Sequence, residues 1–410
     1  MAVHTRYPRI IPILFTHFGE DWIRGSERVL LDLIDGLDSS RFEPILWCNG
    51  SELASVARSK AIRVYESPMQ YWRLRNDVGN LRRFYSQIHR AHDLISMHGI
   101  QLLHANSAAP AQWLVPIARS LRIPLVVHLH SPYLRRDRFA LLLHHASVVV
   151  GVSQATLAGF VADGMPSSRL RLIPNGIDAA RYSVPRASNM RNGLGIGDSE
   201  VVIGTVGSLI PRKAIDLLLR AFASANASRP MWLLVAGEGP ERAYLTALAE
   251  DLGVSTRTIF LGYVCDPIQI YDAIDVHVLA SRQEAFGLVI AEAAFRGVPT
   301  IGSNIDGISE VIRDNETGVL FTCDDPIALG QAIRVLVDDD ALRHRLGSAA
   351  RLDALNRFTL NRVVVDFQGV YEELLLMPPE ELGWASSVRI SISIYARLAA
   401  RLSRIVPTSF

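Results

Sequence analysis

The 410-residue chain has little lysine, little cysteine and no long apolar run. Only Lys60 and Lys213 are lysines, whereas 40 residues are arginine. The three cysteines, Cys48, Cys265 and Cys323, lie far apart, which excludes a disulfide framework and indicates a reducing compartment. No stretch reaches the ~20 apolar residues that span a bilayer, and "IIPILF" is too short for a secretion signal. We therefore expect a cytoplasmic protein, with peripheral contact to the inner face of the membrane as an addition.

Charge is spread unevenly along the chain. The formal net charge is +1, but residues 1–180 carry 20 basic against 14 acidic side chains. A basic first half favours an anionic partner or an anionic membrane surface, and a solvated surface of mixed charge is the alternative. The stretches "YWRLRNDVGNLRRFY" and "SPYLRRDRF" interleave arginine with aromatic residues, as nucleic-acid binders do. No nucleic-acid module accompanies them, so we expect no nucleic-acid partner.

Short apolar strands alternate with amphipathic helices in two successive series. This alternation predicts two α/β domains, each with a doubly wound parallel sheet. Residues 183–200 are rich in Pro, Gly, Ser and Asn, which predicts a linker. We expect Rossmann-like domains over residues 1–182 and 201–357. Residues 358–410 would form a C-terminal helix, packing back towards the first domain, and an amphipathic tail. A central cleft would hold the ligand beyond the carboxyl ends of the strands.

Two motifs of other chemistries fit poorly. The stretch "GEGPER" is the nearest match to a dinucleotide fingerprint, but Arg242 stands where the third glycine belongs. We therefore expect neither a nicotinamide dehydrogenase nor a cofactor. The stretch "DDD", residues 338–340, matches an Asp-x-Asp metal motif only formally, because it lies between helical stretches. We interpret it as a helix-capping turn and expect no metal.

Two glutamates, Glu284 and Glu292, stand eight residues apart in "EAFGLVIAEA". In one helix their Cα atoms would be ~12 Å apart along the axis, beyond the ~5–9.5 Å of glycosidase carboxylate pairs. We interpret them as holding two ends of one elongated ligand. Free N–H groups at the helix start between them favour a phosphate. The alternative is that these acidic residues merely suit the helix dipole.

The same segment resembles the donor-binding region of retaining GT-B glycosyltransferases of family 4, the group 1 class. The stretches "GSERVLLDLIDGL", "IPLVVHLH" and "VGSLIPRKAIDLLLRAF" precede it in the order expected for that family. The resemblance implies a GT-B fold of two Rossmann-like domains. It also implies retaining transfer from a UDP- or GDP-sugar to a glycan or lipid-linked acceptor in surface polysaccharide synthesis. A nucleotide-sugar epimerase, a sugar phosphorylase and a non-catalytic binding subunit remain alternatives.

The resemblance implies roles for residues of the second domain. Glu292 would bind the ribose hydroxyls of the nucleotide, and Glu284 would contact the transferred sugar. Lys213 would pair with the diphosphate, and Val264 would line the base. The backbone that would face the diphosphate is that of Phe286, Gly287 and Leu288. A fixed cation and helix N–H groups would stabilise the charge that develops on the leaving group.

In the first domain the resemblance implicates a loop and a histidine. Gly25 would let the loop approach the donor. His130, at the end of "PLVVHLH", would lie near the transferred sugar, and a purely structural histidine is the alternative. His128, two residues earlier on the same strand face, is the other histidine that fits the motif. We expect His130, Glu284 and Lys213 to be the catalytic residues.

Several residues depart from the family pattern. Ser208 stands where an arginine is common, so one cation for the diphosphate is missing unless the neighbouring Arg212 compensates. Ala214, Arg24 and Asp306 each stand where the family usually has glycine. These departures would either retune the specificity for sugar and acceptor or weaken the activity.

Overall fold

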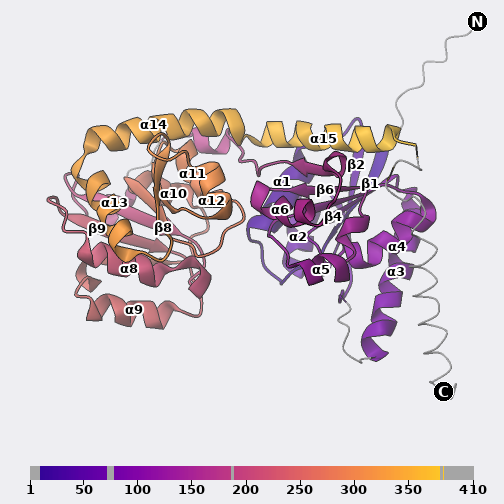
Figure 1. Cartoon of the computed structure of the whole chain (residues 1–410), viewed down its shortest axis with the longest axis horizontal. Coiled ribbons are helices and arrows are strands. Elements are labelled where there is room, and N and C mark those ends of the chain that lie inside the picture. The colour runs from indigo at the N-terminus through magenta and orange to yellow at the C-terminus, as the bar shows by residue number, and fades with distance from the viewer. Residues whose placement is uncertain (1–9, 72–77, 186–188, 379–381, 383–410) are drawn as a thin grey trace, which may run out of the picture. The chain divides into compact units, whose positions relative to one another are not determined.

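The computed structural model describes residues 10–71, 78–185, 189–378 and 382 (Figure 1). They form two compact units. The first unit holds the described residues up to Gly151, residues 159–171 and those from Val364 on, and the second holds residues 152–158 and 172–363. Residues 172–182, which the sequence analysis placed in the first domain, thus pack with the second unit. One reason is that Ile177 bridges to Thr359. The expected amphipathic tail lies outside the described residues.

The first unit contains a seven-stranded sheet in the order β3-β2-β1-β4-β5-β6-β7. Every pair from β3 to β6 is parallel. The strands are β1 Ile11–His17, β2 Phe42–Cys48, β3 Arg63–Glu66, β4 Leu102–Asn106, β5 Leu125–Leu129, β6 Val148–Gly151 and β7 Leu170–Leu172. The helices are α1 Gly25–Gly36, α2 Ser51–Ser59, α3 Val78–His98, α4 Ala111–Leu121 and α5 Arg135–Ala140. Helix α6, Gln154–Ala162, begins in the second unit and belongs to the first from residue 159 on.

The second unit contains a six-stranded parallel sheet in the order β10-β9-β8-β11-β12-β13. The strands are β8 Val201–Val206, β9 Met231–Ala236, β10 Thr258–Gly262, β11 Val276–Leu279, β12 Thr300–Ser303 and β13 Gly318–Phe321. The helices are α7 Asn189–Gly193, α8 Ile215–Ser224, α9 Arg242–Asp251, α10 Ile268–Ala273, α11 Leu288–Phe295, α12 Asp306–Val311, α13 Pro326–Asp338 and α14 Asp340–Arg357. One core lies under α8, α9 and α13, and the other under α10, α11 and α12.

Both sheets reverse their strand order at one point. Successive strands step outward from β1 to β3, and the chain then returns to place β4 on the other side of β1. In the second sheet β11 pairs with β8 in the same way. This order is that of doubly wound Rossmann-like sheets, so the predicted fold class is confirmed. Loops that follow the two central strands of such a sheet diverge and leave room for a ligand.

Helix α15, Leu360–Leu376, belongs to the first unit from Val364 on (Figure 1). The ring of Phe367 lies 5.5 Å from that of His104 and 4.8 Å from that of His128. The hydroxyl of Tyr371 is 2.8 Å from Nδ1 of His104. Helix α15 therefore seals one face of the first sheet with aromatic side chains. Among the described helices, including α15, none is long and apolar enough to cross a bilayer.

Buried histidines should make the fold sensitive to acid. Burial lowers the pKa of His104 and His277 to about 3, and the pKa of His128 well below its usual value. Below about pH 6.5 the unfolded chain then binds more protons than the folded protein. The free energy of unfolding should fall on acidification from about pH 6.5 towards 3, by up to ~1.4 kcal/mol per pH unit for each histidine.

Urea unfolding at a series of pH values tests this expectation. Both ring nitrogens of His128 lack a hydrogen-bond partner among the described residues. His128→Phe should therefore reduce the slope of stability against pH, because it removes one titrating ring from an aromatic environment. An unchanged slope in this variant would contradict the assignment.

Candidate active site

Lys213 and Glu284 lie on the loops that follow the adjacent strands β8 and β11. Nζ of Lys213 forms an ion pair with Oε2 of Glu284, and each side chain is only 14% exposed. Lys213 ends a short 3₁₀ helix, Pro211–Lys213, just before α8. Two of the residues predicted for the site are therefore in direct contact, although 71 positions separate them.

Arg212 points in the same direction as Lys213. Its Nη1 lies 3.5 Å from the same Oε2 of Glu284 and donates a hydrogen bond to the carbonyl oxygen of Gln283 at 2.8 Å. Adjacent side chains need not share a direction, and here both cations meet one carboxylate. Arg212 thus supplies a second positive charge in a loop where Ser208 supplies none.

Arg282 holds the loop of Lys213 against the loop of Glu284. Its guanidinium donates to the carbonyl oxygen of Pro211 at 2.7 Å and to both carboxylate oxygens of Asp216 at 3.2 and 3.1 Å. Its Nε donates to Asp324 at 2.7 Å. The hydrogen bonds that Arg282 donates to Asp216 raise the pKa of Arg282 further above its usual value. The sequence analysis missed Arg282, because its partners come from two other parts of the chain: Pro211 and Asp216 follow β8, and Asp324 follows β13.

Gly287 forms the turn into α11. It has a left-handed φ of 85°, and a Cβ there would press on Ile290 and on Leu279 of β11. Leu288 is the first residue of the helix, and Phe286 is buried with its ring 5.4 Å from that of Phe358. This turn therefore needs glycine and exposes the free N–H groups of the first turn of α11.

Glu292 lies within α11, and its side chain is buried. The hydroxyl of Tyr271 in α10 donates a hydrogen bond of 2.7 Å to its Oε2. Glu284 precedes the helix and Glu292 follows one turn in, so the two acids belong to different parts of the site. Val264, after β10, is half-buried against the same core. Tyr271 is a further residue that spacing along the chain did not reveal.

The glycines of "GEGPER" let two loops cross. Gly237 has a φ of 144°, and a Cβ there would overlap the carbonyl oxygen of Gly207. A Cβ on Gly239 would overlap the carbonyl oxygen of Leu209. Backbone bonds from Gly207 to Ala236 and from Leu209 to Glu238, each 2.9 Å long, join the crossing loops. These glycines therefore shape the approach to the loop of Lys213.

Two departures from the family pattern occupy left-handed backbone. Ala214, at the start of α8, has a φ of 52°, and Asp306, the first residue of α12, has a φ of 32°. Gly307 follows Asp306, and its N–H donates to the carbonyl oxygen of Glu284 at 3.2 Å. Both positions thus keep a backbone conformation that glycine adopts most easily.

In the first unit His130 follows β5 and is partly exposed. Its Nε2 lies 2.8 Å from Oδ1 of Asn106, the last residue of β4. Loss of hydration lowers the pKa of His130 to about 3, so its ring is neutral. His128 is 1% exposed and packs against Phe367. Of the two histidines, His130 therefore offers the ring that a ligand can reach.

Gly25 is the first residue of α1, and Arg24 precedes it as the N-cap. The guanidinium of Arg24 stacks over the exposed ring of Trp22, 3.6 Å from its centroid. Glu27, in the first turn of α1, accepts a hydrogen bond of 3.0 Å from the N–H of Arg24. The side chain of Arg24 therefore lies on its neighbour rather than across the N–H groups of the helix start.

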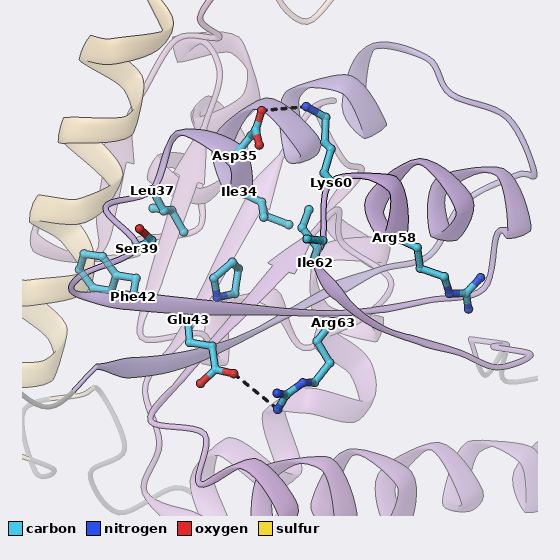
Figure 2. A pocket seen from close by; sticks show the side chains of 12 residues that line it. Ile34, Asp35, Leu37, Ser39, Phe42, Glu43, Arg58, Lys60, Ile62 and Arg63 are labelled. Atoms are coloured by element: carbon cyan, nitrogen blue, oxygen red, sulfur yellow. Dashed lines mark hydrogen bonds and ion pairs between the residues drawn. The ribbon is translucent and has the colours of Figure 1, made fainter.

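Figure 2 shows a pocket of about 550 Å³ in the first unit that contains none of these residues. It lies at the amino ends of β2 and β3. Lys60, the other lysine, pairs there with Asp35 at 2.7 Å, and Arg63 lies 3.5 Å from Glu43. Lys60 is thus part of a surface ion pair, in contrast to the less exposed Lys213.

A second pocket of the first unit, of about 530 Å³, lies at the carboxyl ends of β2 and β3. Arg83 and Arg90 of α3 line it together with Trp47 and Gln87. Arg83 donates to Oε1 of Gln70 at 3.1 Å, and Arg90 stacks on a tyrosine ring. None of the described residues that line this pocket is acidic.

The predicted site residues fall into two groups. The second unit holds Lys213, Val264, Glu284, Phe286, Gly287, Leu288 and Glu292, and the first holds Gly25 and His130. Each group lies at the carboxyl ends of its own parallel sheet. Two doubly wound units with such loops define a GT-B protein.

Family models identify the particular group. Residues 187–353 match the model "Glycosyl transferases group 1", and residues 23–181 match "Glycosyltransferase Family 4". The chain belongs to the group 1 glycosyltransferases, and it is therefore an enzyme of sugar transfer.

Named relatives agree with this assignment. The chain is 26% identical over 296 residues to N-acetyl-alpha-D-glucosaminyl L-malate synthase of Bacillus anthracis. This alignment covers 69% of the chain and 77% of that relative. It is 32% identical over 285 residues to the GDP-mannose-dependent alpha-(1-6)-phosphatidylinositol monomannoside mannosyltransferase of Mycolicibacterium smegmatis. This alignment covers 65% of the chain and 74% of that relative. The crystal structure of Anabaena HepE in complex with UDP and glucose superposes with a TM-score of 0.76 at 24% identity, over 88% of the chain and 100% of HepE. This likeness shows the fold.

The loop crossing at Gly237 yields a stability prediction. Gly237→Ala should lower the melting temperature strongly, because a Cβ would overlap backbone of the Gly207 loop. Gly164→Ala is the matched control, since Gly164 also has a positive φ, of 79°, but has open space around it. The control should cost about 1 kcal/mol from backbone strain alone. Equal losses in thermal denaturation would refute the packing role of Gly237.

Proposed function

We propose that the protein is a retaining, metal-independent glycosyltransferase that takes a sugar from a nucleotide diphosphate donor, a UDP- or GDP-sugar. The observation that carries this proposal is the contact of Lys213 with Glu284 beside the start of α11. A largely buried cation, a carboxylate and free helix N–H groups are the parts that a sugar diphosphate needs. The Anabaena neighbour was solved with UDP and glucose, which supports such a donor.

The chemistry follows from these parts. Cleavage of the sugar–phosphate bond places negative charge on the leaving diphosphate and positive charge on the sugar ring. The ammonium of Lys213 and the N–H groups of residues 286–288 stabilise the first charge. The carboxylate of Glu284 lies beside the sugar and stabilises the second. Because Lys213 and Glu284 already form an ion pair, both side chains are fixed in place before the reaction. Neither has to move when charge develops on the donor.

The nucleotide is held further along α11. Glu292 accepts hydrogen bonds from the ribose hydroxyls, and Tyr271 orients its carboxylate through the bond of 2.7 Å. Val264 contributes an apolar wall for the base. Arg212 and Lys213 both pair with the diphosphate. Arg212 thereby supplies the positive charge that Ser208 lacks. This arrangement supports one extended donor along the edge of the second sheet.

The acceptor is a glycan or a lipid-linked sugar in surface polysaccharide synthesis, and it binds to the first unit. The two relatives named above act on malate and on a phosphatidylinositol mannoside, both of which carry anionic groups. The pocket with Arg83 and Arg90 suits such a group, because no described lining residue is acidic. His130 and Gly25 contact the sugar that is transferred.

Nucleotide binding tests the donor site. A panel of UDP, GDP, UDP-glucose and GDP-mannose should contain a ligand that raises the melting temperature of the wild type. Lys213→Ala and Glu292→Ala should each abolish that shift, because the first removes the less exposed of the two cations at the diphosphate and the second removes the acceptor for the ribose hydroxyls. Arg212→Ala should reduce the shift. Lys213→Arg should keep part of the shift that Lys213→Ala loses.

Lys60→Ala provides the matched control, since it removes the other lysine from a surface ion pair. It should retain the full ligand-induced shift. A full shift in Lys213→Ala and Glu292→Ala would sink the donor-site assignment. Once an acceptor is found, proton NMR of the product reports whether the anomeric configuration is retained.

We also propose peripheral contact with an anionic membrane on the inner face, made by α5. Leu134 and Phe139 at this helix are 64% and 50% exposed. The side chains of Arg135 and Arg136 between them are 76% and 81% exposed. Exposed apolar residues that flank exposed arginines suit an interface of acyl chains and anionic headgroups.

Vesicle sedimentation tests this contact. The wild type should bind vesicles of phosphatidylcholine with one quarter phosphatidylglycerol and should dissociate from them at high salt. The double variant Leu134→Ser with Phe139→Ser should bind several-fold less. Val161→Ser, which alters a side chain 63% exposed on α6 of the same unit, should bind as the wild type does. Unchanged binding of the double variant would exclude α5 as the contact.

A further inference from the structure

The side-chain amide of Asn106 lies between two histidines of the first unit. Its Nδ2 is 2.9 Å from Nδ1 of His17, the last residue of β1, and its Oδ1 is 2.8 Å from Nε2 of His130. Asn106 is fully buried, and His17 is 3% exposed. The ends of β1, β4 and β5 thus carry one continuous line of polar groups.

The orientation of the amide of Asn106 follows from its other neighbour. Nδ2 also lies 3.2 Å from the carbonyl oxygen of Ser26. A carbonyl oxygen only accepts hydrogen bonds, so the group that faces it must be the NH₂. Oδ1 therefore faces His130. Because Oδ1 is an acceptor, Nε2 of His130 must carry the hydrogen.

Glu27 fixes the other end of the line. Its Oε1 lies 2.9 Å from Nε2 of His17 and 3.1 Å from the hydroxyl of Ser26. Burial opposes the charge, but the hydrogen bond from His17 prevails and lowers the pKa of Glu27 to about 2. The carboxylate accepts from Nε2–H of His17. Nδ1 of His17 lies 3.0 Å from the backbone carbonyl oxygen of Asn106 and 2.9 Å from its Nδ2, so it either donates to the first or accepts from the second. In both cases the contact with Ser26 keeps Oδ1 of Asn106 towards His130.

Gly19 leaves room for the pair of Glu27 and His17. A Cβ on Gly19 would lie 2.7 Å from Nε2 of His17 and 3.2 Å from Oε1 of Glu27. The loop after β1 thus passes directly over this hydrogen bond. Glu27 also binds the N–H of Arg24, so the same carboxylate holds the loop that carries Gly25.

We propose that Glu27, His17 and Asn106 are positioning residues that hold His130 as an imidazole protonated on Nε2, so that its Nδ1 accepts a hydrogen bond from a hydroxyl group of the bound sugar. No described residue bonds Nδ1 of His130, and the ring is partly exposed. The line of hydrogen bonds therefore ends at an acceptor open to a ligand. This inference rests on the proposed function for the identity of the ligand, but not for the tautomer.

NMR of the ring nitrogens tests the tautomer without any ligand. In protein labelled with ¹⁵N-histidine, long-range ¹H–¹⁵N spectra distinguish Nε2–H from Nδ1–H, and His130→Gln assigns the signal. The wild type should show Nε2–H at His130. Asn106→Leu should lose this preference, and Asn106→Asp should keep it, because a carboxylate oxygen still accepts from Nε2–H. His277, which bonds Thr300 in the second unit at 3.1 Å, is the internal reference and should not change.

Hydrolysis of the donor tests the positioning role. The substrate is UDP-glucose or GDP-mannose, whichever gives the larger thermal shift with the wild type. Asn106→Leu should lower kcat about tenfold or more while KM changes less than about twofold, and Asn106→Asp should recover part of the loss. Gln112→Leu, which removes another buried amide from the same unit, should retain the kcat of the wild type. Gly19→Ala should lower kcat as Asn106→Leu does, since it displaces Glu27 from His17.

The outcomes separate the inference from the proposed function. Nδ1–H at His130 in the wild type would overturn the inference whatever the enzyme transfers. The expected tautomers together with an unchanged kcat in Asn106→Leu would overturn the positioning role. If no nucleotide sugar binds or is hydrolysed, the proposed function fails, while the spectra still decide the tautomer.

Discussion

The reversal of strand order in each parallel sheet is the constraint on which the rest of the structure depends. A parallel strand must be followed by a crossover, and the two central strands send their crossovers in opposite directions. Their carboxyl ends are therefore free of covering helices. In the second sheet these ends carry Lys213 and Glu284, and in the first they carry His17 and Asn106. The side chains meet because of the topology, not because of their distance in the sequence.

The ion pair of Lys213 and Glu284 gives this edge its chemistry. Opposite charges in a largely buried setting attract more strongly than they would in water. Arg282 adds fixed geometry, because it joins the carbonyl oxygen of Pro211 to the side chains of Asp216 and Asp324. The loop of Lys213 is thus held from both sides. With Arg212 at the same carboxylate, the positive charge that is absent at Ser208 reappears four residues later.

The sequence predicted the elements well because their apolar patterns are local. Strands such as β4 and β11 are short apolar runs with polar ends, and those ends mark the edge where ligands bind. Lys213, Glu284 and Glu292 could be assigned by their resemblance to family motifs. The line from Glu27 to His130 could not, because His17 and Asn106 are 89 residues apart and the tautomers depend on the orientation of one amide. Arg282 escaped notice for the same reason, since its partners follow β8 and β13 and lie far from it in the sequence.

The backbone conformation explains how two departures from the family pattern fit into the fold. Ala214 and Asp306 both adopt left-handed angles, so each keeps a turn that glycine makes more easily, at a cost of about 1 kcal/mol. The turn at Asp306 still brings the N–H of Gly307 to the carbonyl oxygen of Glu284. Asp306 therefore keeps the turn of the backbone, and what departs from the family pattern is its carboxylate side chain. Under the proposed function, a carboxylate at position 306 would repel anionic sugars and favour those that present hydroxyl groups as donors.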